Sequence, residues 1–405
     1  MSDHASPWGT PRSAPVRRRQ TTARELVFER VAPVRSMDWW LQGAVMALMV
    51  IGALLVWSAT KTSQSAKGLD PAGYLKKDIL NIGIGLALGA VTARVDYRSL
   101  RAYAPIVYVL SLFGLVVVLS PLGVTINGAH SWIKLPGGFE IQPSEFAKIA
   151  LIVGIAMILG EKRDGESTPR RSDVGLVLGF AALPMGLIML QPDFGTMMVL
   201  VFIILGTLAL SGVKARYVVA FVAIGALLGF VGVQAHLLKR YQVDRLTAFA
   251  HENKNVTSTA YNVDQAKTAI GAGGLFGTGL FHGSQTNGGY VPEQETDFIF
   301  TAAGEQFGFA GSAALLILLA MVLWRGTRIA AAADDTFGML MAAGVVAWFA
   351  FQTFVNVGMT MGIMPVTGLP LPFVSYGGSS LFANMIAIGL LQNVHAHTNS
   401  DDSGL

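Results

Sequence analysis

The sequence predicts an all-α, polytopic membrane protein with about ten transmembrane helices. Of its 405 residues, 52% are hydrophobic and only 13% are charged, whereas soluble domains carry about 25% charged residues. So few charges cannot cover a water-facing surface, and apolar runs recur that approach the roughly 20 residues of a membrane-spanning helix. The net charge of +4 gives no reason to expect a nucleic acid partner, and the absence of cysteine excludes disulfides and thiolate metal sites.

The chain begins with a polar, basic, proline-containing segment, residues 1–36. Its composition predicts a disordered cytoplasmic tail. A cleavable signal peptide would place a short apolar run close behind a short basic start, but the first apolar run begins only at Trp39 and is long enough to span a bilayer. We therefore expect a transmembrane domain over residues 37–396 and a short cytoplasmic tail over residues 397–405.

Ten segments have the length and apolar character of membrane spans. They are residues 38–60, 74–94, 102–121, 143–161, 173–190, 193–212, 216–236, 304–324, 336–361 and 375–394. The fourth segment is the least apolar, because Glu145 and Lys148 lie in its first turns.

The connections between these spans differ in charge. One set is basic and contains, besides the arginines of the first segment, Arg94, Arg98, Arg101, Lys162, Arg163, Arg170, Arg171, Lys214, Arg216, Arg325 and Arg328. The short connections of the other set contain only Lys61, Lys67, Lys76, Lys77 and Lys134. Because basic loops remain in the cytoplasm, we expect both termini on the cytoplasmic side of a bacterial inner membrane.

One outer connection, residues 237–303 between the seventh and eighth spans, is far longer than the others. Loops of more than about 15 residues are usually functional or disordered. An amphipathic stretch over residues 260–270 favours a functional, partly ordered structure on the membrane face over a flexible linker.

Two predicted spans open with a Gln-Pro pair followed by an acidic residue. After the first pair, Glu145 and Lys148 share a helix face at i and i+3 and can neutralise each other. After the second pair comes Asp193. Ionisable residues in membrane spans are costly and are therefore candidate functional residues. A substrate cavity that opens to the outer side and a structural helix cap with an ion pair both fit this pattern.

Four acidic residues concentrate where the long loop re-enters the membrane, namely Glu293, Glu295, Asp297 and Glu305. Crowded carboxylates beside an apolar surface raise one another's proton affinity, which suits one of them to act as a base or metal ligand. The apolar residues 298–300 directly follow Asp297. They favour a half-desolvated position at the bilayer boundary over a solvated acidic rim.

The last outer connection, residues 364–380, contains three prolines in apolar surroundings. It cannot form a regular helix, because proline removes hydrogen-bond donors and restricts φ. Irregular backbone at membrane depth persists only where protein or a water-filled cavity satisfies it. We therefore expect a re-entrant hairpin that lines a cavity, with a simple rigid turn as the alternative.

Several motifs extend these observations. They are Asn127-Gly128 with Trp132-Ile133, Gln142-Pro143-Ser144-Glu145, Gln191-Pro192-Asp193, Tyr261-Asn262 with Gln265, Gly273-Gly274-Leu275 with Gly277 and Gly279, Gly283-Ser284-Gln285, Thr296-Asp297-Phe298-Ile299-Phe300, and the stretch from Leu371 to Ser380. Together they resemble the SEDS family (shape, elongation, division and sporulation), over nearly all of residues 38–396. Residues 355–370 are more similar to the RodA branch than to the FtsW branch.

This resemblance implies a peptidoglycan glycosyltransferase of cell elongation, which polymerises lipid II into β-1,4-linked glycan strands. Its implied partners are a class B penicillin-binding protein (a monofunctional transpeptidase of the penicillin-binding protein 2 type) and the elongation machinery. The family's essential aspartate corresponds to Asp297, and its cavity residues correspond to Glu145, Lys148 and Asp193.

The sequence departs from the family pattern beside this aspartate. The family commonly has His before Thr-Asp, where this chain has Glu295, and it often has a second Glu where this chain has Gln306. These departures argue against an essential role for the flanking positions and leave Asp297 unaffected.

The implied reaction needs a carboxylate that takes a proton from the acceptor sugar hydroxyl, and we expect Asp297 to be this general base. The departing diphosphate needs positive charge, which Lys148, Arg240, Arg245 or a divalent cation (Mg²⁺ or Mn²⁺) with unassigned ligands could supply. The residues expected to bind the substrate are Glu145, Lys148, Asp193, Arg245, Gln265, Gln285 and Ser375.

Two other functions fit parts of the pattern. A flippase for lipid II would also use paired charges and proline-broken helices, but it needs a path open to both faces, and the candidate residues all lie near the predicted outer face. A scaffold for the transpeptidase would leave the buried charges without a purpose.

Overall fold

The computed structural model describes residues 37–126, 129–136, 139–161, 169–234 and 258–401. The chain divides into two units, Met1–Val31 and Ala32–Leu405. The first unit and the rest of the predicted tail, residues 1–36, lie outside the described residues. So does the segment 235–257, which contains Arg240 and Arg245. The following description concerns the second unit.

Ten helices correspond to the ten predicted spans. They are α2 (Trp39–Ala66), α3 (Gly73–Arg94), α4 (Tyr97–Val118), α5 (Pro143–Leu159), α6 (Arg171–Leu190), α7 (Phe194–Leu210), α8 (Ala215–Gln234), α12 (Ile299–Ala332), α13 (Thr336–Thr360) and α14 (Gly378–Asp401). Among the described residues, α2, α4, α6, α12 and α13 are long and apolar enough to cross a membrane by length and composition alone. The predicted all-α polytopic architecture is confirmed.

Several helix boundaries differ from the predicted ones by a few residues, and two of these differences change the predicted long loop and the predicted C-terminal tail. The eighth span, α12, begins at Ile299 rather than at residue 304, so its first turn belongs to the predicted loop 237–303. It kinks at Gly308, whose φ of 66° and ψ of −164° are not helical. The last helix, α14, continues to Asp401 and therefore includes the first residues of the predicted tail 397–405.

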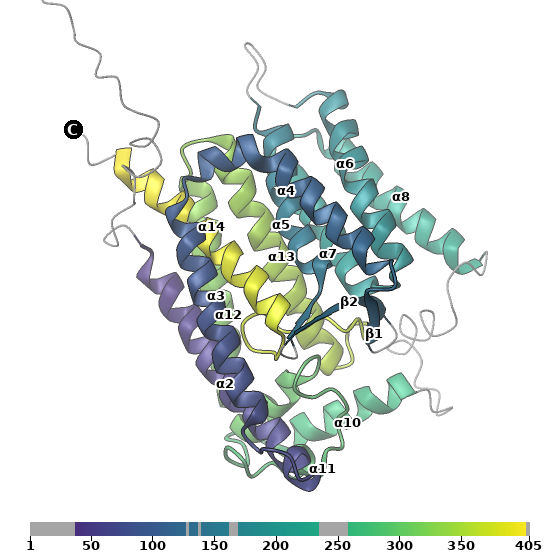
Figure 1. Ribbon diagram of the computed structural model, residues 1–405, viewed down its shortest axis with the longest axis vertical. Helices are drawn as coiled ribbons and strands as arrows, with labels where there is room; N and C mark the ends of the chain where they lie inside the picture. Colours follow the sequence, from purple (N-terminus) through teal and green to yellow (C-terminus); the bar gives the residue numbers. More distant parts are fainter. Residues whose placement is uncertain (1–36, 127–128, 137–138, 162–168, 235–257, 402–405) are drawn as a thin grey trace, which may run out of the picture. The chain divides into compact units, whose positions relative to one another are not determined.

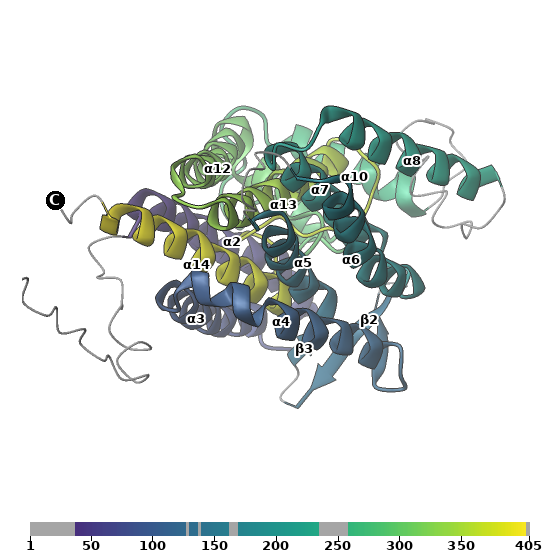
Figure 2. The same cartoon turned by 90° about the horizontal axis from the view of Figure 1, so that it is seen from above.

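Helices α5 and α13 occupy the middle of the bundle, and the other helices surround them (Figures 1 and 2). Almost every residue of α5 is buried, including Glu145 and Lys148. On α13 the buried residues include three polar ones, Gln352, Asn356 and Thr360. Polar groups in such an interior must find partners within the protein, since no water is available to bind them.

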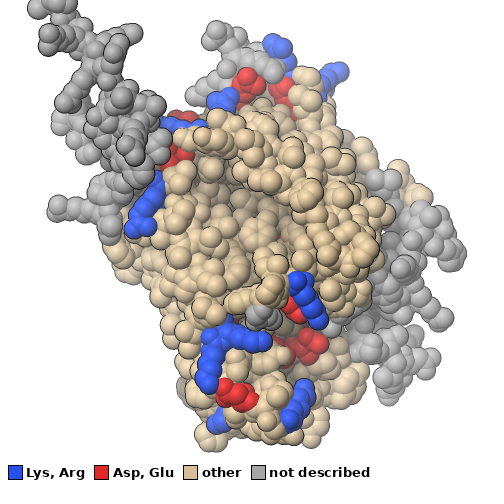
Figure 3. All heavy atoms as spheres, in the orientation of Figure 1, with Lys and Arg blue, Asp and Glu red and all other residues tan. Residues whose placement is uncertain are grey.

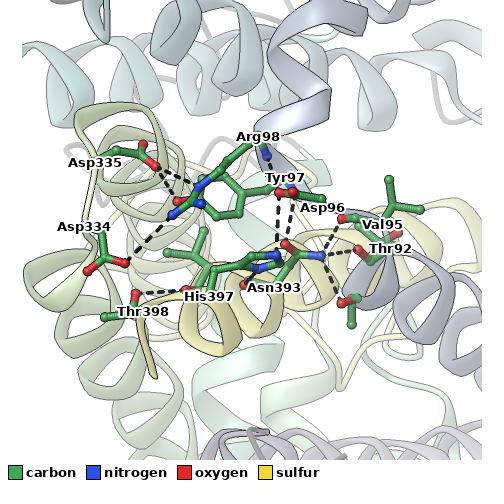
Figure 4. Close-up of polar contacts among 12 residues, drawn as sticks. Thr92, Val95, Asp96, Tyr97, Arg98, Asp334, Asp335, Asn393, His397 and Thr398 are labelled. Atoms are coloured by element: carbon green, nitrogen blue, oxygen red, sulfur yellow. Dashed lines mark hydrogen bonds and ion pairs between the residues drawn. The ribbon is translucent and has the colours of Figure 1, made fainter. Parts of the chain in front are cut away.

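The α3 and α14 helices pack closely because small residues line their contact. An added Cβ at Gly89 would lie 2.9 Å from the carbonyl oxygen of Met385, and one at Gly389 would lie 2.5 Å from that of Gly89. At the end of this contact, the side-chain amide of Asn393 donates hydrogen bonds to the carbonyl oxygens of Thr92, Ala93 and Val95 (Figure 4). Asn393 thereby satisfies the last carbonyl groups of α3.

The bundle has two distinct ends. One end, here called the basic end, contains the described residues of the basic connections and the polar network of Figure 4, in which the hydroxyl group of Tyr97 donates to Asp335 and Arg98 pairs with Asp334 and Asp335. The opposite end, here called the loop end, contains the long connections. In Figure 3 the charged side chains of the described residues gather toward these two ends, and uncharged residues cover the surface between them. A bilayer core would cover that surface.

The loop end contains structure that the apolar pattern does not reveal. Strands β1 (Gly123–Ile126), β2 (Ala129–Leu135) and β3 (Phe139–Ile141) form an antiparallel sheet in the order β1-β2-β3, in which Ile133 pairs with Gly123 and Ile141. The long loop contains helices α10 (Ser258–Ala272) and α11 (Ser284–Gly288), both at this end (Figure 1). The predicted partly ordered loop is thereby confirmed for its described part.

Candidate functional site

Asp297 lies at the loop end in a tight turn directly before α12. The backbone amides of Thr296, Asp297 and Phe298 all donate to the carbonyl oxygen of Glu293, at 3.3, 3.1 and 3.2 Å. Phe298 is buried, whereas Asp297 is half-buried. The turn therefore places the carboxylate between the apolar interior and the surface, as the sequence predicts.

The Asp297 carboxylate faces the irregular connection between α13 and α14, residues 361–377. An added Cβ at Gly368 would lie 3.4 Å from Oδ2 of Asp297. Gly368 has a φ of +73°, a left-handed conformation that side chains disfavour. Glycine at this position therefore allows the turn of the connection, and the carboxylate lies at about van der Waals distance from it.

The connection 361–377 itself is inserted among the helices. Two of its carbonyl groups lie against helix glycines. An added Cβ on Gly52 would lie 2.6 Å from the carbonyl oxygen of Val374, and one on Gly195 would lie 2.8 Å from that of Thr367. Its residues Leu369, Leu371, Phe373 and Val374 are buried. This buried, irregular path agrees with the predicted re-entrant segment and not with a simple turn on the surface.

Glu145 and Lys148 form the predicted ion pair on α5, with the Lys148 ammonium nitrogen 2.7 Å from Oε1 of Glu145. The relative exposures of the two side chains are 3% and 0%. The ammonium group also lies 4.4 Å from the centre of the Trp348 ring, an attractive cation–π position. Oε2 of Glu145 is buried and has no hydrogen-bond partner among the described residues. One carboxylate oxygen of the pair, Oε2, can therefore still accept a hydrogen bond inside the bundle.

Two amide side chains of α13 connect this ion pair to the connection 361–377. Oε1 of Gln352 accepts from Nε1 of Trp348 at 2.7 Å and from Lys148 at 3.5 Å, while its Nε2 donates to the Pro370 carbonyl oxygen at 2.7 Å. One turn later, Nδ2 of Asn356 donates to the carbonyl oxygens of Leu369 and Asp297 at 2.7 and 2.8 Å. Gln352 therefore links the ion pair to Pro370, and Asn356 links Asp297 to the adjacent Leu369.

Asp193 holds helix ends together. It is the N-cap of α7, accepting from the Thr196 amide at 3.0 Å and from the Thr196 hydroxyl at 2.8 Å. It also accepts from Nε2 of Gln142 at 2.8 Å and from the Ser144 hydroxyl at 3.4 Å. The two Gln-Pro openings thus meet at the loop end, and Asp193 links the start of α5 to the start of α7.

The four acids of the predicted cluster occupy different environments. Glu305 is fully buried and accepts from the amides of Gln285 and Thr286 at 2.7 and 2.8 Å and from the Thr286 hydroxyl at 2.6 Å. It therefore holds α11 in place. Glu293 is exposed, and only Glu295 and Asp297 are half-buried. The sequence predicted these four acids as one cluster of negative charge. In the structure Glu293 lies at the surface, Glu295 and Asp297 lie at the boundary, and Glu305 lies in the interior.

Glu295 has an altered proton affinity. Burial raises its pKa above the ordinary value of 4.5, and the negative charge of Glu293 acts in the same direction. Its carbonyl oxygen accepts from the Tyr376 amide at 2.9 Å. The turn that contains Asp297 is therefore joined to the connection 361–377 at two residues. Glu295 bonds Tyr376 directly, and Asp297 is joined to Leu369 through Asn356.

The other predicted substrate residues are more dispersed. Gln265 is half-buried on α10, Gln285 is half-buried on α11 beside Glu305, and the Ser375 hydroxyl accepts from the Leu371 amide at 2.8 Å within the connection. Arg245, like Arg240, lies outside the described residues. The contacts of the described residues bring Asp297 together with the connection that contains Ser375. They do not join it to the side chains of Gln265 or Gln285.

Gln352 and Asn356 are absent from the predicted site residues. The signal that could have revealed them is two amides at i and i+4 in an otherwise apolar span, since polar side chains in membrane helices tend to face functional interiors. Among the described residues, no three His, Asp or Glu side chains come together as a potential metal site.

Comparisons with known proteins agree with this architecture. The family model of cell cycle proteins that groups FtsW, RodA and SpoVE matches residues 39–400. Stage V sporulation protein E of Bacillus subtilis is 37% identical over 90% of this chain and 98% of its own length. Peptidoglycan glycosyltransferase MrdB of Escherichia coli K12 is 36% identical over 87% of this chain and 92% of its own length.

Solved structures show the same fold. The rod shape-determining protein RodA of Thermus thermophilus has a TM-score of 0.65 at 30% identity, covering 89% of this chain and 96% of that chain. A chain in a peptidoglycan synthase complex that coordinates polymerization and crosslinking has a TM-score of 0.74 at 30% identity, covering 89% and 98%. The present chain is therefore a multi-pass membrane protein that belongs to the SEDS family, with FtsW, RodA and SpoVE.

Proposed function

We propose that this chain is a peptidoglycan glycosyltransferase that polymerises lipid II during cell elongation. Relatives that carry the name peptidoglycan glycosyltransferase, MrdB and FtsW, are 36% identical to it over 87% of its length. The observation that carries the proposal is the half-buried Asp297 carboxylate, which faces Gly368 of a buried connection at the loop end. A lipid-linked sugar can reach such a boundary position while its polyprenyl chain remains in the bilayer.

In this reaction Asp297 acts as general base. It takes the proton from the acceptor sugar hydroxyl as that oxygen attacks the anomeric carbon of the donor. A new carbon–oxygen bond forms while the bond from the anomeric carbon to the lipid diphosphate breaks, with inversion at that carbon. A positioned carboxylate contributes typically 10²–10⁴-fold to such a step.

The leaving diphosphate carries away the bonding electron pair and needs positive charge close by. Lys148 is fully buried and paired with Glu145, so it serves this purpose only for a substrate that enters the bundle. A divalent cation, Mg²⁺ or Mn²⁺, fits the single carboxylate of Asp297, because Mg²⁺ is often held by one or two carboxylates and by substrate phosphates. When bound, such a cation would neutralise charge on the diphosphate.

The proposed cellular setting follows from charge and from the solved neighbour. We propose that the basic end faces the cytoplasm of a bacterial inner membrane, with both termini inside and Asp297 outside. A structural neighbour is part of a peptidoglycan synthase complex that coordinates polymerization and crosslinking. We accordingly propose a class B penicillin-binding protein as the partner, which would crosslink the strands that this chain polymerises.

The test is polymerisation of purified lipid II by the protein co-purified with its transpeptidase partner. The wild type with Mg²⁺ or Mn²⁺ should form glycan polymer, and Asp297→Ala and Asp297→Asn should both lose it at unchanged yield and melting temperature. A fully active Asp297→Ala protein would refute the assignment of the base. If the wild type only moves labelled lipid II across vesicle membranes without polymerising it, the protein is a flippase.

A further inference from the structure

Asn356 is a fully buried amide near the end of α13 that lies at the loop end of the bundle. It lies on α13 with an exposed fraction of 0%, four residues after Gln352. Transfer of an amide from water into an apolar environment is unfavourable unless hydrogen bonds compensate for it. A polar residue at such a position in an apolar helix is therefore expected to have a specific role.

Both hydrogens of the Asn356 amide nitrogen are used. Nδ2 donates to the carbonyl oxygen of Asp297 at 2.8 Å and to that of Leu369 at 2.7 Å. Oδ1 is buried, and no described residue forms a hydrogen bond with it. Rotation of the amide group by 180° would place Oδ1 against two carbonyl oxygens, so these two acceptors determine its orientation.

The two acceptors belong to segments far apart in the sequence. Asp297 ends the turn before α12, and Leu369 precedes Pro370 in the connection that the Asp297 carboxylate faces. Within the turn, three amides share the carbonyl oxygen of Glu293 at 3.1–3.3 Å, which is the long end of the usual hydrogen-bond range. Asn356 adds one shorter hydrogen bond to the turn from outside it, at 2.8 Å to the Asp297 carbonyl oxygen.

We propose that Asn356 is a positioning residue for Asp297: its amide joins the main chain of Asp297 to that of Leu369 and thereby holds the carboxylate against Gly368. This role rests on the proposed function of Asp297 as general base. Catalytic groups lose efficiency when they are displaced by about 1 Å, by as much as about 10²-fold. The Gln352 amide supports the arrangement, because it holds the next carbonyl group, that of Pro370.

The first test is kinetic and uses the complex with the transpeptidase partner. Asn356→Ala should lower kcat by about 10²-fold while KM for lipid II changes little, because the substrate does not contact this buried amide. The matched control is Asn384→Ala on α14, where the asparagine is also buried. Among the described residues its Oδ1 has no hydrogen-bond partner, and the hydrogen bonds to the carbonyl oxygens of Asp297 and Leu369 come from Asn356. Asn384→Ala should keep wild-type kcat.

Asn356→Asp gives a signature that a general packing defect would not produce. The introduced carboxyl can donate one hydrogen bond when protonated and repels both carbonyl oxygens when ionised. The kcat of this variant relative to wild type should therefore rise as the pH falls from about 8 to about 5.5. A pH-independent ratio would contradict the proposed hydrogen bonds.

A second readout does not depend on activity. Hydrogen exchange of the full-length complex should be about tenfold faster at the amides of Thr296, Asp297 and Phe298 in Asn356→Ala than in wild type, and unchanged in Asn384→Ala. Unchanged exchange at these amides, or equal loss of kcat in both alanine variants, would overturn the positioning role. Faster exchange in Asn356→Ala, combined with a wild-type complex that fails to polymerise lipid II, would instead refute the proposed function and leave the structural link intact.

Discussion

The ammonium nitrogen of Lys148 lies 2.7 Å from Oε1 of Glu145, and both side chains are buried within the bundle. Removing two charges from water is unfavourable, and mutual attraction offsets this only when geometry and further hydrogen bonds are good. Here Gln352 and the Trp348 ring also contact the ammonium group, while Oε2 of Glu145 has no hydrogen-bond partner in the part of the chain that the structure describes. The pair is therefore satisfied on the lysine side and incomplete on the glutamate side.

Removing one member of this pair should destabilise the protein strongly. In Glu145→Ala the Lys148 ammonium group remains buried without its counter-ion, and we expect the free energy of unfolding to fall by about 3–5 kcal/mol. Replacing both residues with apolar ones, Glu145→Leu with Lys148→Met, should restore most of the stability. Denaturant unfolding in detergent micelles measures both effects.

The double variant also distinguishes a structural role of the ion pair from a role in handling the substrate. If the pair handles substrate, the double variant is stable but does not polymerise lipid II. Polymerisation at the wild-type rate would show that the pair serves only to hold α5 and α13 together.

Two glycines of α2 should respond in opposite ways to alanine. At Gly52 the new methyl group would lie 2.6 Å from the Val374 carbonyl oxygen, so the connection 361–377 must shift. We expect Gly52→Ala to lower stability by about 1–3 kcal/mol and to reduce polymerisation. At Gly43 nothing lies within 4 Å, and alanine should stabilise the helix by about 0.5–1 kcal/mol. Thermal unfolding and polymerisation assays of both glycine variants test this prediction. Equal behaviour of the two variants would mean that the connection 361–377 does not pack against α2.

The buried carboxylate of Glu305 should control the order of the short helix α11. Glu305→Ala leaves the amides of Gln285 and Thr286 without an acceptor, and hydrogen bonds to a charged group contribute about 1.5–3 kcal/mol each. Hydrogen exchange over residues 283–290 should therefore accelerate in this variant. The control is Glu293→Ala, since Glu293 is exposed and its loss should leave that segment unchanged. Equal protection in both variants would argue against this role.

The raised pKa of Glu295 predicts a pH dependence of stability. An acid whose pKa is raised in the folded protein contributes stability below its ordinary pKa of 4.5, and this contribution is lost as the pH rises through the raised value. We therefore expect the melting temperature of Glu295→Gln to exceed that of wild type by a margin that grows from about pH 4.5 to about pH 8. Thermal unfolding across this range measures the margin.

A second variant checks the cause of this shift. Glu293→Gln removes the neighbouring negative charge, so it should reduce the margin without abolishing it, because burial is the larger cause. An equal margin at all pH values would show that Glu295 does not titrate differently in the folded protein.

The apolar pattern of the sequence was sufficient for the ten helices, because a bilayer requires long apolar segments whose backbone groups are bonded within each helix. It also revealed Glu145 and Lys148, since an ionisable residue stands out in a membrane span. Asp297 stood out for another reason, because it belongs to an acidic cluster and directly precedes the apolar residues 298–300. The sheet β1-β2-β3 was not predicted, because its strands have only four, seven and three residues. Such short strands carry little periodic signal.

The sequence by itself thus determined which residues enter the membrane and which of them are chemically unusual. Only the tertiary structure decided how those residues meet. It buried Glu305 under α11, separated it from Asp297, and joined Asp297 to Leu369 through Asn356. The physical reason is that hydropathy is a property of each segment alone, whereas a hydrogen bond from α13 to two distant carbonyl groups depends on how the helices pack against the irregular connection.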